Sequence, residues 1–137
     1  EQALSLYQQV FQQDPLNVEA LLGLAVLYNQ NGQFDEALYL LNKLLRLEPE
    51  NALALNQSGV ALAGNGDWQS AEKAFVLAIK KDPQLIDAQR NYGRALIENG
   101  EYKSGIATFQ TILHNHPEDI STLLYMTQLF IETEHYE

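Results

Sequence analysis

The chain has 137 residues, of which 46% are hydrophobic, so it is long enough for one domain and apolar enough to bury a core. The formal net charge of −10 disfavours nucleic acid and anionic membrane surfaces as partners. The sequence has no cysteine, which excludes disulfides and thiolate metal sites, and no apolar run approaches the roughly 18 residues of a membrane span. We therefore expect no nucleic-acid partner, no membrane insertion, and a soluble protein for which the cytoplasm is the favoured compartment.

The four prolines are evenly spaced, each 34 residues after the one before: Pro15, Pro49, Pro83 and Pro117. Other positions keep the same step. Three glycines each follow an asparagine and precede an aromatic residue by two positions; they are Gly32, Gly66 and Gly100, followed by Phe34, Trp68 and Tyr102. Such a fixed period indicates a tandem repeat.

Each period contains two stretches of helical periodicity. Leu21, Leu24 and Tyr28 fall on one face of the first, and the Asn–Gly pair then ends that helix because glycine adopts positive φ at little cost. The proline prevents the second helix from continuing. We expect eight helices, at 2–13, 18–31, 34–47, 52–65, 68–81, 86–99, 102–115 and 120–133. Their N-caps include Asn17, Asn51 and Asp119, whereas Leu85 at the same repeat position cannot cap through its side chain.

Small residues recur at two positions of the period, where they let the two antiparallel helices approach closely. In the first helices they are Ala25, Gly59, Gly93 and Thr127, and in the second helices Ala37, Ala71 and Gly105. A large residue recurs four positions after each of the latter: Leu41, Phe75 and Phe109, with Tyr7 one period earlier. One hairpin cannot bury its own apolar faces, so the pattern predicts stacked hairpins with a continuous core.

This register resembles the tetratricopeptide repeat. In the second period the matching residues are Leu55, Ser58, Gly59, Leu62, Gly66, Trp68, Ala71, Phe75, Ala78 and Pro83. The resemblance implies an all-α, right-handed α-solenoid of stacked antiparallel helix hairpins. It divides the chain into the second helix of a partial repeat (1–17), three repeats (18–51, 52–85 and 86–119) and the first helix of another partial repeat (120–137). Because the chain opens inside a predicted helix, we expect it to be part of a longer protein.

Motifs that would indicate catalysis or metal binding are few. His114 and His116 are two residues apart near a helix end, where they point in different directions, and we interpret them as exposed turn residues; His135 lies far along the chain. The glycines never form a phosphate-binding run, and no nucleophile motif occurs. We expect no enzyme activity, no metal and no cofactor.

Each first helix keeps a second stripe of residues spaced by three or four, outside the packing positions. The resemblance implies that first helices line a concave side on which such arrays commonly bind peptides. The candidate partner-binding residues there are Leu22, Val26, Leu53, Asn56, Val60, Arg90, Asn91, Arg94, Leu124 and Gln128. The leucines and valines of the first two repeats would form one exposed apolar patch, the asparagines would bond a ligand's backbone, and the arginines would grip a carboxylate.

Two alternatives to this interpretation stay open at the level of residues. Some of the apolar residues could pack between adjacent hairpins. Arg90 could pair with Asp87, and Arg94 with Glu98, as ordinary ion pairs on a helix surface.

The sequence favours a protein-interaction scaffold that binds a peptide or helical segment of a partner on its concave face. Leu22 and Val26 occupy positions where carboxylate-binding members of the family would need Lys and Asn, so we do not expect chaperone C-terminal tails as ligands. Two other functions are open. The chain could be the recognition arm of a larger enzyme such as a glycosyltransferase, or a self-assembly array joined through its terminal helices. Independently of these functions, the helix at 2–13 lacks its hairpin partner. We expect much of its face with Leu4, Tyr7, Val10 and Phe11 to be uncovered, and extra repeats or a neighbouring molecule to cover it.

Overall fold

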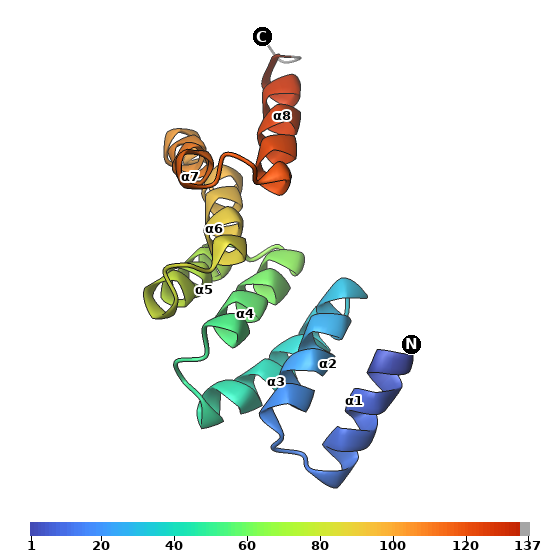
Figure 1. Ribbon diagram of the computed structural model, residues 1–137. Helices are drawn as coiled ribbons and strands as arrows, with labels where there is room; N and C mark the ends of the chain where they lie inside the picture. Colours follow the sequence, from blue (N-terminus) through green and yellow to red (C-terminus); the bar gives the residue numbers. More distant parts are fainter. Residues whose placement is uncertain (135–137) are drawn as a thin grey trace.

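The computed structural model describes residues 1–134, which fold into eight α-helices (Figure 1). They are α1 (Gln2–Gln13), α2 (Val18–Gln30), α3 (Phe34–Leu47), α4 (Ala52–Gly64), α5 (Trp68–Lys81), α6 (Ile86–Glu98), α7 (Tyr102–Asn115) and α8 (Ile120–Glu134). The predicted bounds of α1, α3, α5 and α7 are confirmed. Three first helices end one residue earlier than expected, and α8 ends one residue later. His135 lies outside the described residues.

Local signals at the helix ends explain these bounds. The side chain of Asn17 accepts the N–H of Ala20 at 3.0 Å, and Asn51 caps α4 in the same way. Leu85 makes no such bond, as expected from its side chain. The asparagine of each Asn–Gly pair takes the C-cap position, and the glycine after it has a positive φ; for Gly32 this is 76°. One cap was not predicted: Asp67 accepts the N–H of Ser70 and begins α5.

Small residues lie where paired helices touch. A Cβ on Gly59 of α4 would lie 2.3 Å from the ring of Phe75 in α5, so only glycine admits that ring. Ala71 is fully buried in the same hairpin. Thr127 occupies the equivalent small position but is exposed, because α8 lies at one end of the stack and no described helix covers it.

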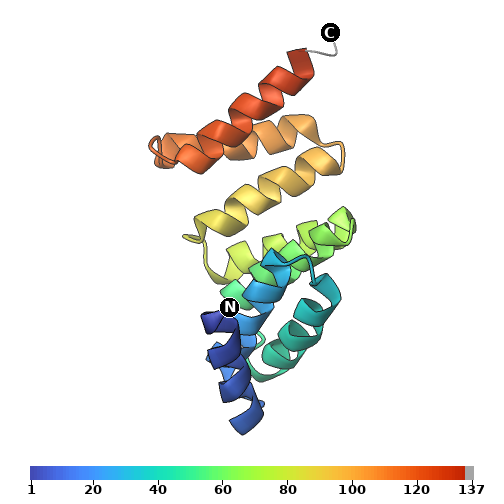
Figure 2. The ribbon, with the colours of Figure 1, turned by 90° about the vertical axis from the view of Figure 1, so that its right-hand side faces the viewer.

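The hairpins stack in one direction, with α1 and α8 at opposite ends (Figure 2). The first helices of successive repeats contact one another directly, α2 with α4 and α4 with α6. Within residues 1–134, no comparable contact joins α3 to α5 or α5 to α7. Helices that lie closer together form the inner side of a curved stack. The concave face is therefore lined by α2, α4 and α6, and the architecture is an all-α solenoid.

The expectation for α1 is wrong in part. Leu4, Tyr7 and Phe11 are half-buried against the core of the first repeat, because α2 and α3 cover one face of α1. The ring of Tyr7 packs where a Cβ on Gly23 would lie, which fixes this contact. Val10 and Leu6 stay exposed, and Leu6 keeps 60% of its surface. Only the outer face of α1 is uncovered.

Candidate functional site

The concave face holds a pocket of about 270 Å³ between the second and third repeats. It is lined by Phe34, Val60, Ala63, Gly64, Trp68, Phe75, Asn91 and Arg94. The local fold explains this opening. The ring of Phe34 lies against Gly64, where a side chain would occupy the same space, and Trp68 follows directly after the Asp67 cap at the start of α5. The pocket is thus mainly apolar, with one cation at its rim.

Arg94 is exposed and lies over Trp68, with its guanidinium carbon 5.5 Å from the centroid of the indole ring. No carboxylate within residues 1–134 lies within ion-pairing distance of it, so the proposed pair with Glu98 does not form. Arg94 and Asn91 also line a second hollow, of about 150 Å³, together with Arg90, Phe109, Ser121 and Tyr125. We name these two adjoining hollows the α4–α8 groove. Arg94 stands where they meet and keeps its donors available for a ligand.

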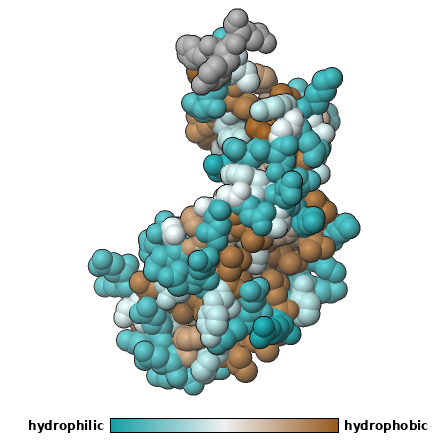
Figure 3. Space-filling view, turned by 180° about the vertical axis from the view of Figure 1, so that it is seen from behind, coloured by the Kyte–Doolittle hydropathy of each residue, from teal (hydrophilic) through white to brown (hydrophobic). Residues whose placement is uncertain are grey.

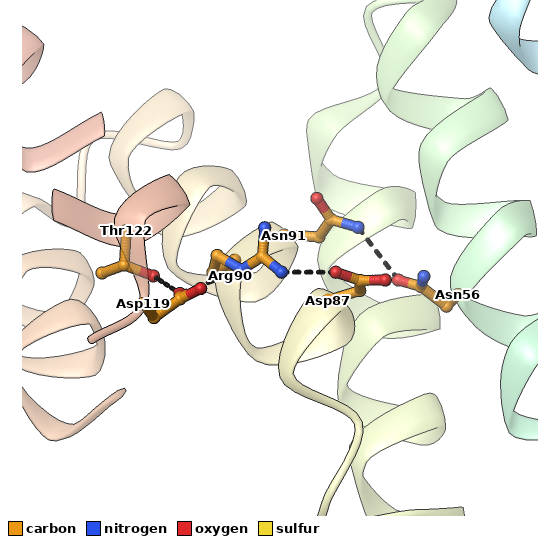
Figure 4. Close-up of polar contacts among 6 residues, drawn as sticks. All are labelled: Asn56, Asp87, Arg90, Asn91, Asp119 and Thr122. Atoms are coloured by element: carbon orange, nitrogen blue, oxygen red, sulfur yellow. Dashed lines mark hydrogen bonds and ion pairs between the residues drawn. The ribbon is translucent and has the colours of Figure 1, made fainter. Parts of the chain in front are cut away.

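Arg90 does not share this role. Its guanidinium pairs with Asp87, as one of the alternatives above proposed, and its Nε lies 3.4 Å from Oδ2 of Asp119 (Figure 4). Asp119 in turn accepts the hydroxyl of Thr122. These contacts join α6 to the start of α8. Two carboxylates already engage Arg90, so of the two arginines only Arg94 is without a carboxylate partner within residues 1–134.

The two asparagines are also engaged. Nδ2 of Asn91 donates to Oδ1 of Asn56 at 3.0 Å, and Figure 4 shows the two amides pointing toward each other across α4 and α6. Asn56 keeps only 4% of its surface, so it cannot reach a ligand and was wrongly placed on the exposed stripe. Its burial follows from the contact between first helices. Asn91 is half-buried and still lines both hollows of the groove.

The expected single apolar patch is divided. Leu22 and Val26 are half-buried and line a separate hollow of about 630 Å³ with residues of α1 and α2. Val60 instead lines the α4–α8 groove, and the two hollows share no residue. Leu53 lines neither and is half exposed, at 50%. The first repeat and the second therefore offer two apolar sites rather than one.

The sequence matches family models described as tetratricopeptide repeat over residues 1–56 and 62–128, and again over residues 30–86. The chain belongs to the tetratricopeptide repeat family. No curated protein matches the sequence.

Solved structures with the same fold include MamA, 28% identical with a TM-score of 0.76 over 87% of this chain and 70% of that one. MamA from Desulfovibrio magneticus RS-1 is 19% identical, with a TM-score of 0.75 over 86% and 67% of the two chains. A tetratricopeptide repeat protein from Parabacteroides merdae is 22% identical, with a TM-score of 0.84 over 97% of this chain and 52% of its own. The family and these neighbours support a protein-interaction scaffold.

The last repeat of the tetratricopeptide array presents Leu124 and Gln128 on α8. Both are exposed, as predicted, and Leu124 keeps 65% of its surface. The amide of Gln128 donates to Glu132 at 2.8 Å. Neither residue lines the two hollows of the groove.

Tyr125 forms the floor of the second hollow. Its ring packs against Phe109 with the centroids 4.8 Å apart, and burial raises the pKa of its phenol above the usual 10.0. Arg94 lines the same hollow, and its positive charge acts in the opposite direction and lowers that pKa. Arg94 is thus the cation of the groove that has no carboxylate partner within residues 1–134, since Arg90 in the same hollow is paired with Asp87 and Asp119.

The groove residues that the sequence did not predict include Phe34, Trp68 and Tyr125. The first two were interpreted as packing residues because they recur at fixed positions of the repeat. They do pack, but their outer edges also line the pocket. The size of Trp68 could have indicated its second role. It is the one tryptophan of the chain, and it stands where the other repeats have Phe34 and Tyr102.

The array shows no group of three metal-ligating side chains within residues 1–134. None of the helices in that part of the chain has both the length and the apolar character needed to span a lipid bilayer.

Proposed function

We propose that the array binds a segment of a partner protein in the α4–α8 groove, with apolar side chains in the pocket beside Trp68 and a carboxylate on Arg94. The observation that carries this proposal is the state of Arg94. It is an exposed arginine over a tryptophan ring, without a carboxylate partner in the described chain, at the junction of two hollows on the concave face.

The chemistry of the groove defines the ligand. Burial of apolar side chains supplies about 25 cal/mol per Å² before the costs of association are subtracted. The guanidinium offers a planar set of donors that matches a carboxylate. The amide oxygen of Asn91 is free to accept an N–H from an extended backbone, while its nitrogen is held by Asn56. The ligand is therefore an extended or helical segment with apolar anchors and one acidic residue.

The charge of the protein sets a limit on affinity. A net charge of −10 repels an acidic peptide at long range, so the carboxylate gains attraction only near Arg94. We expect dissociation constants of about 1–100 μM, typical of a modest groove with one charge-assisted contact.

Selection from a random peptide library on the intact protein tests the proposal. Enriched peptides should combine two or three apolar residues with one Asp or Glu. Arg94→Ala should weaken their binding about tenfold or more, the effect of losing a charge-assisted hydrogen bond. Val60→Glu should abolish binding by placing a charge in the apolar pocket.

Arg46→Ala is the matched control, because Arg46 is exposed at the end of α3 and lines neither hollow of the groove. Because Trp68 is the one tryptophan of the chain, binding in the groove should change the tryptophan fluorescence of the protein. Enriched peptides that bind Arg94→Ala and Val60→Glu as well as the original protein would exclude this groove.

End-to-end self-assembly is the second candidate, favoured by the apolar residues that α1 and α8 expose. They include Leu6, Ile120 and Leu124, each more than half exposed. Light scattering at several protein concentrations tests this function. A mass that stays constant from micromolar to near-millimolar protein would rule it out.

A further inference from the structure

A third kind of hollow lies apart from the concave face. It encloses about 480 Å³ and is lined by Phe11 of α1, Tyr28 of α2, and Asp35, Glu36, Tyr39 and Leu40 of α3. It shares no residue with the α4–α8 groove. Viewed from behind, the space-filling structure shows apolar groups interspersed with polar ones over the repeats of the N-terminal half (Figure 3). Three aromatic rings and two carboxylates thus meet at one depression.

The repeat itself does not require these residue types. One and two periods after Tyr39 stand Lys73 and Ala107, and after Phe11 come Leu45 and Ile79. The acidic pair Asp35 and Glu36 gives way in the same manner to Gln69 and Ser70, then to Lys103 and Ser104. The hairpins that carry these replacements stack normally. Packing therefore accounts for an apolar residue at the Phe11 position. Asp35 accepts a hydrogen bond from Asn65, and both acids suit the first turn of α3, but neither reason accounts for exposed Tyr39.

A cation already faces these rings. The ammonium nitrogen of Lys43 lies 4.7 Å from the centroid of Tyr39 and 5.7 Å from that of Phe11. Both distances lie within the range of a cation–π contact, about 6 Å. Lys43 makes no ion pair within residues 1–134, so its ammonium contacts ring faces rather than a carboxylate. Tyr39 keeps 61% of its surface, so its outer part is open to a second cation.

We propose that this hollow binds the ammonium group of a lysine side chain from a partner polypeptide. The lysine stem lies along Leu40 and the aromatic edges, and the ammonium lies over Tyr39 near Glu36. Lys43 occupies the rings when the partner is absent and is displaced on binding. The net charge of −10 attracts such a basic partner. The ligand charge is opposite to the one that the α4–α8 groove takes, so the two sites accept different segments.

The test is a titration of the intact protein with Nα-acetyl-lysine N-methylamide, followed by NMR of the tyrosine ring protons. The norleucine derivative, which has the same stem without the charge, is the control probe. We expect the lysine probe to shift the ring signals of Tyr28 and Tyr39 with millimolar affinity. The norleucine probe should bind at least tenfold more weakly. Equal binding of the two probes would overturn the proposal.

Three variants at the hollow and one control variant outside it test the proposal further. Lys43→Gln removes the internal competitor and should tighten binding about threefold or more, an outcome that no purely structural role of Lys43 predicts. Glu36→Gln should weaken binding without altering the fold. Tyr39→Leu should abolish it, whereas Tyr102→Leu, at an exposed tyrosine outside the hollow, should leave it unchanged. Unchanged or weaker binding by Lys43→Gln would show that the rings serve Lys43 alone and would contradict the proposal.

Discussion

Ala71 shows how a single small side chain determines the distance between two helices. It is fully buried in the α4–α5 hairpin, beside the contact of Gly59 with Phe75. Ala71→Leu adds three carbons at a site without room for them, so we expect destabilisation by about 1–3 kcal/mol. Urea unfolding should show a lower midpoint. Ala107→Leu, the same exchange at an exposed position of α7, is the control and should leave the midpoint almost unchanged.

The partial burial of Tyr125 and Tyr92 can be tested through the pKa values of their phenols. Burial is the main cause that raises the pKa of both above 10.0. The folded state therefore holds these protons to higher pH than the unfolded chain does. Their contribution to stability is complete below about pH 10, where the unfolded phenols are still protonated, and is lost as the pH rises through the folded pKa. Tyrosinate absorbance can be followed as the pH is raised. Tyr125→Phe should remove part of the absorbance increase that occurs above the pH at which ordinary tyrosines ionise. If this high-pH absorbance increase were unchanged in Tyr125→Phe, the raised pKa of Tyr125 would be refuted.

The role of a single residue could be predicted from the sequence when its partners lie nearby along the chain, and could not when they lie in another repeat. Capping by Asn17 and Asn51 depends on the next three residues and was visible in the sequence. The burial of Asn56 depends on Asn91 in another repeat, and the position of Arg90 depends on Asp119 in the next. Such contacts become visible only when neighbouring first helices are known to touch.

The element that depends most on one ion pair is α8. Its start is held by the contact of Arg90 with Asp119, whose side chains keep 28% and 18% of their surfaces. Asp119→Asn should weaken this attachment by about 0.5–1 kcal/mol, the usual size of a partly exposed pair. The amides of α8 should then exchange with solvent about two- to fivefold faster.

Asp87→Asn is the matched control, because it removes the other carboxylate of Arg90 while leaving α8 attached. Equal effects of the two variants on α8 would contradict the role of Asp119.

Helices were predictable almost to the residue because each has its own start and stop signals within one period. The shared hollows between helices were not, because they depend on which edges of packing residues remain uncovered. Trp68 is the main example, since the same ring fills the repeat and lines the groove. Leu22 and Val26 line a hollow together with Gly23 and Tyr7, and it shares no residue with the hollow that Val60 lines.

For the whole molecule, stability is distributed along the stack. Each repeat contacts only its neighbours, so the two ends have fewer partners than the centre. Helix α1 has no buried residue, whereas α2, α3 and α4 have four or five each. Hydrogen exchange should therefore be fastest in α1 and α8 and slowest from α3 to α5. One uniform rate for all helices would instead indicate global unfolding as the only opening event.

We propose that the α4–α8 groove holds a partner segment, and this binding can be mapped directly. The most direct measurement is NMR chemical-shift mapping with a selected peptide that carries apolar anchors and one acidic residue. We expect the shifted amides to gather on α4, α6 and α8 and to include Val60, Arg94 and the indole of Trp68. At the same peptide concentration, the shifts should be much smaller in Arg94→Ala protein. Shifts confined to α3, α5 and α7, or shifts that saturate equally in Arg94→Ala, would contradict it.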